Sequence, residues 1–167
     1  MSKREIENYL RGAAGFPLLE KPDVTLESVV VTQKDGTLHF SIPSHNMRPE
    51  QVKSFLASEK WIELTFGAML RLHGFNPRHQ VQCSAGIADI VSDLGVYEVK
   101  KYLTRQTMFE ALGQALAYRQ AINPDICAVI VGIVTPEAKA LIPAIEAVSQ
   151  GVFVVNWGRS FLKDKAQ

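Results

Sequence analysis

The amino-acid sequence predicts an α/β fold in which helices cover a mixed central sheet. From residue 49 onward, helix-like and strand-like segments follow one another in the order helix, three strands, helix, strand, helix, strand. The segment 126–134 is almost wholly apolar and β-branched, which is typical of a central strand covered on both faces. These two observations together predict an α/β/α sandwich.

The first 48 residues are expected to form an appendage to this sandwich. Residues 3–14 are predicted to form a short helix. Two strand-like runs, 24–32 and 37–43, flank a segment that contains Asp35-Gly36, a strong hairpin signal. A lone two-stranded ribbon is only marginally stable in water, so it should pack on the main domain or on a second subunit. We therefore expect a helix and a β-hairpin over 1–48, followed by a main domain over 49–167.

A long helix and a strand are expected to open the main domain. The helix is predicted from Pro49, a residue suited to a first helical turn, to about His73. Gly74 is a natural stop for it. A strand-like stretch follows at residues 80–83.

The next two strands are predicted to form a hairpin. Strand-like runs at 87–91 and 96–101 are separated by a four-residue loop that contains Asp93 and Gly95. With this loop, Ile90 faces Tyr97 across the two strands.

The last third of the chain completes the alternating pattern. Thr104 or Thr107 is expected to cap a helix that reaches about Ile122. After the central strand, a helix is predicted over 136–149 and a final strand over 152–155.

The composition excludes several classes of protein. No apolar run approaches the roughly 20 residues that a membrane span needs, and the N-terminus lacks the apolar stretch of a signal peptide. Cys83 and Cys127 are too few and too far apart to indicate a disulfide framework, which fits a reducing cytoplasmic location. The formal net charge of +1 gives no sign of a nucleic-acid partner, so DNA binding would need a local patch.

The predicted hairpin over 87–101 brings three charged side chains together. Asp89 is expected directly opposite Glu98, and cross-strand partners point to the same face of a sheet. Lys100 follows Glu98 by two residues and shares its face, whereas Val99 points the other way.

Two carboxylates opposed in this way repel each other unless a cation or a proton relieves the repulsion. A hard divalent ion does so, and Mg²⁺ commonly binds one or two protein carboxylates. The Lys100 ammonium would supply positive charge where negative charge develops in phosphoryl chemistry. A Glu-x-Lys pattern alone usually reflects a solvated strand. The convergence with Asp89, inside an apolar strand, favours a divalent-metal site for phosphodiester hydrolysis.

These segments resemble the metal-binding signature of a known family. Gly86-Ile87-Ala88-Asp89-Ile90-Val91 followed by Val96-Tyr97-Glu98-Val99-Lys100 is similar to the motif of the PD-(D/E)XK nuclease superfamily, which has the restriction-endonuclease-like fold. Asp89, Glu98 and Lys100 take the places of its aspartate, second acid and lysine. The dipeptide before Asp89 does not end in proline, which departs from the name-giving pattern. The resemblance covers roughly residues 55–157.

Two flanking features extend the resemblance. Glu63 stands where many members carry a further glutamate on the helix before the hairpin. Gln114 and Tyr118 match the Gln-x-x-x-Tyr pair of RecB-like nucleases, a spacing that places both on one helical face. The alternative for Glu63 is an exposed helix charge. For Gln114 and Tyr118 it is ordinary packing and solvation.

The resemblance implies a Mg²⁺-dependent endonuclease that hydrolyses DNA, with Mn²⁺ as a substitute ion. Asp89 and Glu98 would hold the ion together with the carbonyl of Val99, and Lys100 would orient or help deprotonate the attacking water. Glu63 would bind a second ion or a metal-bound water.

The resemblance also implies a positioning role and an oligomer. Gln114 would position Lys100 or the attacking water. One such site cuts one strand, so double-strand cleavage would require a homodimer or a higher homo-oligomer.

Two other functions stay open at this point. The domain could be catalytically inactive and act as a DNA-binding or protein-interaction module. It could also act on RNA or from strand ends.

Other polar side chains carry weaker signals. His73 and His79 lack metal-ligand spacing and are expected at the surface. The candidates for DNA-backbone contacts are Arg71, Arg78, Lys101, Arg105 and Arg119.

Overall fold

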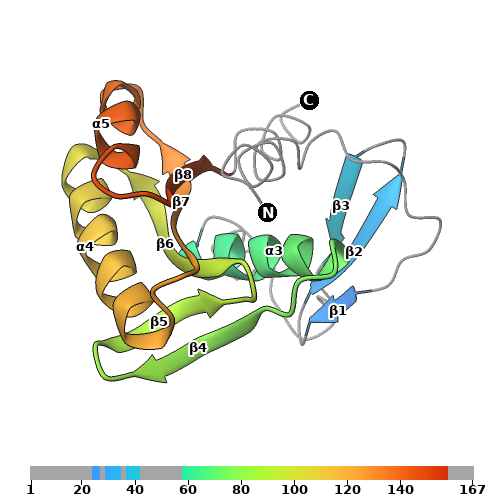
Figure 1. Cartoon of the computed structure of the whole chain (residues 1–167). Coiled ribbons are helices and arrows are strands. Elements are labelled where there is room, and N and C mark those ends of the chain that lie inside the picture. Colours follow the sequence, from blue (N-terminus) through green and yellow to red (C-terminus); the bar gives the residue numbers. More distant parts are fainter. Residues whose placement is uncertain (1–23, 27–28, 35–36, 42–57, 158–167) are drawn as a thin grey trace.

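The computed structural model describes residues 24–26, 29–34, 37–41 and 58–157, the first three segments as strand backbone only. A five-stranded mixed sheet forms the centre, in the order β4-β5-β6-β7-β8 (Figure 1). Its strands are β4 (Arg78–Cys83), β5 (Gly86–Val91), β6 (Gly95–Leu103), β7 (Cys127–Val134) and β8 (Val152–Asn156). Pairing is antiparallel from β4 to β6 and parallel from β6 to β8. The predicted α/β class with a mixed sheet is therefore confirmed.

Helices cover both faces of this sheet. α3 (Glu59–Leu72) packs on one face through side chains that include the fully buried Phe66. α4 (Arg105–Ile122) and the short α5 (Ile142–Glu146) share a core on the other face. β7 contributes alternate side chains to the two cores, as expected of the predicted central strand.

The start of α3 differs from the prediction. Ser58 has an extended backbone, with φ −97° and ψ 159°, and its hydroxyl accepts a hydrogen bond from the N–H of Trp61 at 3.1 Å. This N-cap ends any helix that approaches from Pro49, so a continuous helix from that residue is wrong; residues 49–57 lie outside the described part of the chain. The predicted stop is confirmed, because Gly74 has a φ of +82°.

α4 is capped as predicted, and α5 is shorter than predicted. Thr104 caps α4 through a reciprocal pair of hydrogen bonds with Thr107. The helix predicted over 136–149 is wrong in extent: a 3₁₀ turn (Lys139–Leu141) precedes α5. Pro143 explains the shortening, because it has no N–H to bond the carbonyl four residues earlier and therefore favours the first turn of a helix.

A separate three-stranded antiparallel sheet lies near the N-terminus. It consists of β1 (Val24–Leu26), β2 (Val29–Lys34) and β3 (Thr37–Ser41), and α3 contacts β1 and β2. The hairpin at Asp35-Gly36 is confirmed by the pairing of β2 with β3. The run 24–32 is not one strand but two, since the polar pair Glu27-Ser28 interrupts it in the sequence. The predicted helix over 3–14 lies outside the described residues, and the division at residue 48 stays a prediction.

Gly132 allows β7 to lie close to an irregular part of β6. Lys100 pairs with Gly132 and Tyr102 pairs with Ile133, so Lys101 is an extra residue in β6. A Cβ added at Gly132 would overlap the carbonyl oxygen of Lys100.

We expect Gly132→Ala to lower the free energy of unfolding by about 1–3 kcal/mol, because the two strands must move apart. Gly113→Ala is a matched control. That position is exposed on α4 with nothing within 4 Å of the added Cβ, and alanine should stabilise the helix by up to about 1 kcal/mol. Urea unfolding of both variants provides the comparison, and equal stabilities would contradict the close approach.

Candidate active site

At Asp89, strand β5 is paired with neither of its neighbouring strands, β4 and β6. Its pairing with β6 ends at Ile90 and Tyr97, so the hairpin register is as predicted up to that point. The next pair, Asp89 with Glu98, was predicted and is not formed. The pairing of β5 with β4 likewise omits Asp89 and the residue opposite it, Gln80. The strand pairing of the sheet is therefore interrupted on both sides of Asp89.

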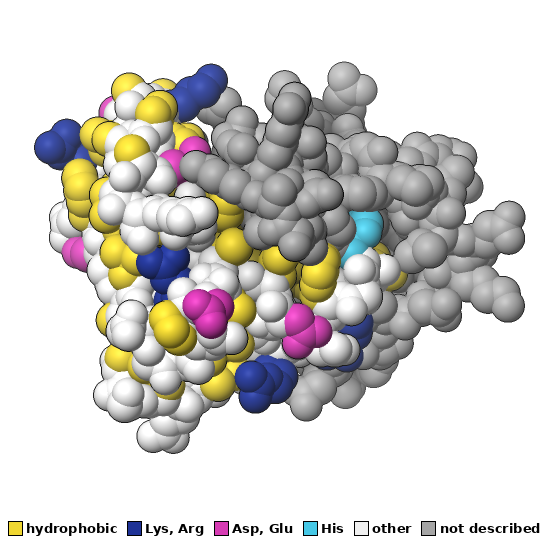
Figure 2. Space-filling model, in the orientation of Figure 1, with side chains coloured by type: hydrophobic (Ala, Val, Ile, Leu, Met, Phe, Trp, Pro, Cys, Tyr) yellow, Lys and Arg dark blue, Asp and Glu magenta, His cyan; other side chains and the backbone are white. Residues whose placement is uncertain are grey.

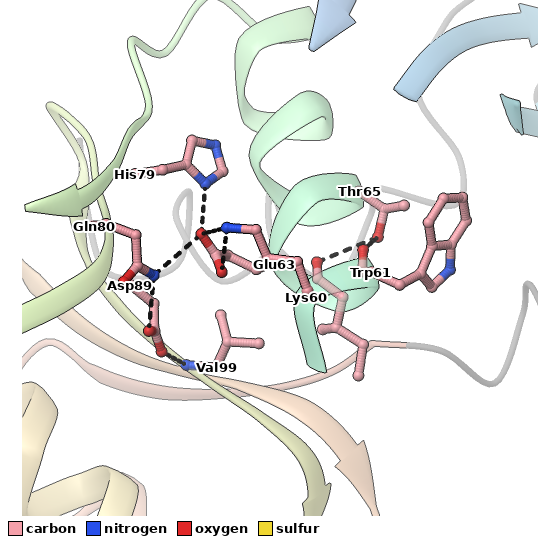
Figure 3. A network of polar contacts seen from close by, with 9 residues as sticks. Lys60, Trp61, Glu63, Thr65, His79, Gln80, Asp89 and Val99 are labelled. Carbon is pink, nitrogen blue, oxygen red and sulfur yellow. Dashed lines mark hydrogen bonds and ion pairs between the residues drawn. The ribbon is translucent and has the colours of Figure 1, made fainter. Parts of the chain in front are cut away.

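Where the strand pairing is missing, the Asp89 side chain accepts hydrogen bonds from both neighbouring strands. Its Oδ2 accepts a hydrogen bond from the N–H of Val99 at 2.8 Å, and its Oδ1 accepts one from Gln80 Nε2 at 3.4 Å (Figure 3). The N–H and C=O of one strand residue point toward the same neighbour, so the Val99 carbonyl also points toward β5. Burial and the charge of Glu63 raise the pKa of Asp89, against the effect of the hydrogen bond from Val99.

The buried Glu98 and the half-buried Lys100 form an ion pair on the α4 face of β6. Lys100 Nζ donates to Glu98 Oε1 at 2.8 Å, which confirms that the two side chains share one face. Val99 belongs to the core on the opposite face. Glu98 is 3% exposed, and its Oε2 has no hydrogen-bond partner among the described residues.

The protonation of this pair follows from its burial. Desolvation and the negative charge of Asp89 raise the pKa of Glu98 to about 7, although the Lys100 ammonium opposes the shift. Burial also acts to lower the pKa of Lys100, but the hydrogen bond and charge of Glu98 outweigh it, so this pKa is raised. Near neutral pH the site thus holds one carboxylate that is close to its titration point.

Glu63 reaches the same region from α3 and is buried, so the alternative of an exposed helix charge is wrong. Lys60 Nζ contacts both of its carboxylate oxygens, at 3.0 and 3.1 Å. His79 Nδ1 lies 2.9 Å from Oε1, and Gln80 Nε2 donates to the same oxygen at 3.3 Å. Burial acts to raise the pKa of Glu63, but the hydrogen bonds from His79 and Lys60 outweigh it and the pKa is lowered.

Figure 3 shows the result as a continuous polar network from α3 to β6. Glu63 lies at its centre, Gln80 connects it to Asp89, and Asp89 reaches the backbone of Val99. The network joins four consecutive elements of the chain, α3, β4, β5 and β6. The sequence pattern pointed to Glu63, Asp89 and Val99 but not to Gln80, which connects the two carboxylates.

His79 is one of the residues that the sequence analysis missed. It was expected at the surface, but its half-buried ring lies against α3, where a Cβ at Gly67 would be 2.6 Å from the ring. Its Nδ1 carries the proton that faces Glu63, because an ionised carboxylate can only accept a hydrogen bond, and its Nε2 is buried without a partner among the described residues. A strand that starts at Arg78 puts His79 on the inward face with Val81, and this alternation was the available signal. His73 is also half-buried, and burial lowers its pKa.

Gln114 and Tyr118 lie on α4 and are hydrogen-bonded to each other. The buried ring of Tyr118 lies beside Gly86 at the start of β5, where an added Cβ would be 3.2 Å from it. Burial and the nearby charge of Glu98 raise the pKa of Tyr118. The pair is therefore near the site, and the predicted action of Gln114 on Lys100 stays a prediction.

The visible surface of the described residues does not carry one large region of a single charge. In Figure 2, Lys and Arg side chains alternate with acidic and hydrophobic ones on this face. Two of the five basic residues predicted to contact DNA have a cation over an aromatic ring: Lys101 over Tyr102 and Arg105 over Phe109. DNA contacts by these side chains stay a prediction.

The donor set near Asp89 fits a hard divalent cation with few protein ligands. The described part of the chain contains no group of three or more His, Cys, Asp or Glu side chains arranged to hold a metal. Two carboxylates and one backbone carbonyl remain, from Asp89, Glu98 and Val99, and Mg²⁺ often takes few protein ligands because it retains several waters. The unpartnered, buried Oε2 of Glu98 is the observation that calls for a cation or a proton.

Comparison of the chain with protein-family models, with curated proteins and with solved structures gave no match. In the described segments, every helix is too short or too polar to cross a membrane.

Proposed function

We propose that this chain is a Mg²⁺-dependent endodeoxyribonuclease with a restriction-endonuclease-like fold, in which Mn²⁺ can replace Mg²⁺. The observation that carries the proposal is the buried Glu98 carboxylate, which has one unpartnered oxygen and a lysine ammonium on the other. A buried carboxylate in this state is costly unless a cation or proton is present. The element order around the five-stranded mixed sheet and the spacing of Asp89, Glu98 and Lys100 support the same reading.

Three groups would hold the ion: the carboxylates of Asp89 and Glu98 and the carbonyl of Val99. When bound, the ion would supply positive charge at the scissile phosphate. Lys100 has three N–H donors, of which one is used by Glu98, so the others can donate to the attacking water or to a phosphate oxygen. Its ammonium would then lie where negative charge develops in the transition state.

Glu63 and Gln114 would have supporting roles. The Glu63 carboxylate already accepts hydrogen bonds from Lys60, His79 and Gln80, so we assign it to a metal-bound water or to orientation of Asp89. Gln114 lies on α4 and would position Lys100 or the attacking water. We also propose a homodimer, because double-strand cleavage needs two sites. The proposed location is cytoplasmic.

Nicking of supercoiled plasmid with and without Mg²⁺ is the direct test. Conversion of the supercoiled form only with Mg²⁺ or Mn²⁺ would support the proposal. Linear duplex and RNA substrates distinguish an endonuclease on DNA from an exonuclease and from an RNA-directed enzyme. DNA binding without any cleavage would instead favour the inactive DNA-binding module.

Lys100→Ala is expected to lose plasmid cleavage by about 10²–10³-fold while retaining most of the DNA affinity, because its ammonium faces Glu98 rather than solvent. Lys139→Ala removes the same charge from an exposed position and should change neither property. Plasmid nicking gives the rate, and fluorescence anisotropy with a labelled duplex gives the affinity. A loss of affinity as large as the loss of rate would assign Lys100 to the phosphate contact instead.

A further inference from the structure

Gln80 has an unusual backbone for its residue type. Among the described residues it is the one non-glycine residue with a positive φ, at +51°. Residues other than glycine, asparagine and aspartate rarely adopt this backbone conformation. It persists where the surrounding structure enforces it. It interrupts the pairing of β4 with β5 at the residue that faces Asp89.

The conformation places the Gln80 amide between two carboxylates. Gln80 Nε2 lies 3.3 Å from Glu63 Oε1 and 3.4 Å from Asp89 Oδ1 (Figure 3). An amide nitrogen carries two N–H donors, so one can serve each carboxylate. The carboxylates belong to α3 and β5, and the glutamine is the side chain that joins them.

The neutral amide suits a site that must keep its negative charge. Glu63 and Asp89 repel each other, as the effect of Glu63 on the pKa of Asp89 indicates. A lysine in this place would cancel one charge, as Lys60 does for Glu63 on its other side. The amide orients both carboxylates and leaves the charge of Asp89 for a cation.

We propose that Gln80 is a positioning residue for the divalent-ion site, and that its amide fixes the Asp89 carboxylate through the shared contact with Glu63. This inference rests on the proposed function. Removal of a hydrogen-bond partner of a metal ligand typically lowers metal affinity by about 10- to 100-fold. The same loss is expected here, separate from any effect on folding.

The test compares Mn²⁺ affinity in two variants that differ in backbone freedom. Gln80→Ala and Gln80→Gly both lack the amide, but glycine adopts a positive φ without strain. Both are expected to bind Mn²⁺ about 10- to 100-fold more weakly in titration calorimetry. Gln80→Gly should nevertheless melt at or above the wild-type temperature. Gln82→Ala, at an exposed glutamine of the same strand, should bind like the wild type.

The outcomes separate the inference from the proposed function. Wild-type affinity in both Gln80 variants would overturn the role of the amide. Weak binding by Gln80→Ala with full binding by Gln80→Gly would also overturn it, because backbone conformation alone would then matter. Absence of Mn²⁺ binding by the wild type would remove the proposed metal site and this inference with it.

Discussion

Asp89→Asn is expected to abolish measurable Mn²⁺ binding and to reduce plasmid cleavage by at least about 10³-fold, with the chain still folded. The change removes one of the two carboxylates of the proposed ion site, and the contribution of the ion to transition-state charge is lost with it. Asparagine keeps an oxygen that can accept the hydrogen bond from the Val99 N–H. This separates the loss of charge from the loss of structure.

Asp89→Ala adds a structural effect to the same functional loss. It leaves the Val99 N–H without its acceptor at the point where β5 and β6 part, which costs about 1–3 kcal/mol. Relief of the repulsion from Glu63 offsets part of this cost, so the variant should also fold. Titration calorimetry and thermal melting of the two variants give both quantities. Mn²⁺ binding by Asp89→Asn as tight as that of the wild type would contradict the assignment of Asp89 as a ligand.

Local sequence signals were sufficient to predict the features that depend on residues close together in the chain. The turn between β5 and β6 set the register up to Ile90, and Thr104 marked the start of α4. Strand alternation placed Glu98 and Lys100 on one face. Each of these features depends on residues within a few positions of one another, which is why a single sequence is enough.

The remaining features depend on contacts that no local pattern encodes. The β4–β5 pairing is interrupted where Gln80 adopts a positive φ, although a glutamine in the sequence gives no sign of that conformation. His79 reaches Glu63 because Gly67 leaves room for its ring on α3. The start of α3 at Ser58 was overlooked because apolar spacing continued across it. The parts of the candidate site that were missed are thus groups that hydrogen-bond to its carboxylates.

The second large expected effect is a dependence of folding stability on pH, which originates from the titration of Glu98. Its pKa is raised from 4.5 to about 7 by burial and by the charge of Asp89, with Lys100 opposing the shift and the charge of Glu59 making the smallest contribution to it. The folded protein therefore retains a proton that the unfolded chain releases. The stability linked to this proton is fully present below about pH 4.5 and is lost as the pH rises through about 7. Its size is on the order of 3 kcal/mol.

The metal-free protein should therefore melt at lower temperature as the pH rises from about 5 to about 8. The raised pKa of Asp89 acts in the same direction at lower pH, whereas the lowered pKa of Glu63 gives stability that is lost on acidification. Glu98→Gln keeps the shape of the side chain and an acceptor for Lys100 but cannot titrate. Its melting temperature should be much less dependent on pH in this range.

Metal binding should show the opposite trend with pH at the same residue. The ion requires the ionised carboxylate, so binding to the folded protein must displace the Glu98 proton whenever the pH is below about 7. We expect the Mn²⁺ affinity to rise by about tenfold per pH unit up to about pH 7 and to level off above it. Calorimetry in two buffers with different heats of ionisation counts the released proton, which should approach one per bound ion at about pH 6. Glu98→Gln lacks this carboxylate and should bind Mn²⁺ too weakly to measure, as expected for Asp89→Asn. An affinity that is constant between about pH 5.5 and 7.5 would show that Glu98 is not a ligand, because a group with this pKa cannot bind the ion without giving up its proton.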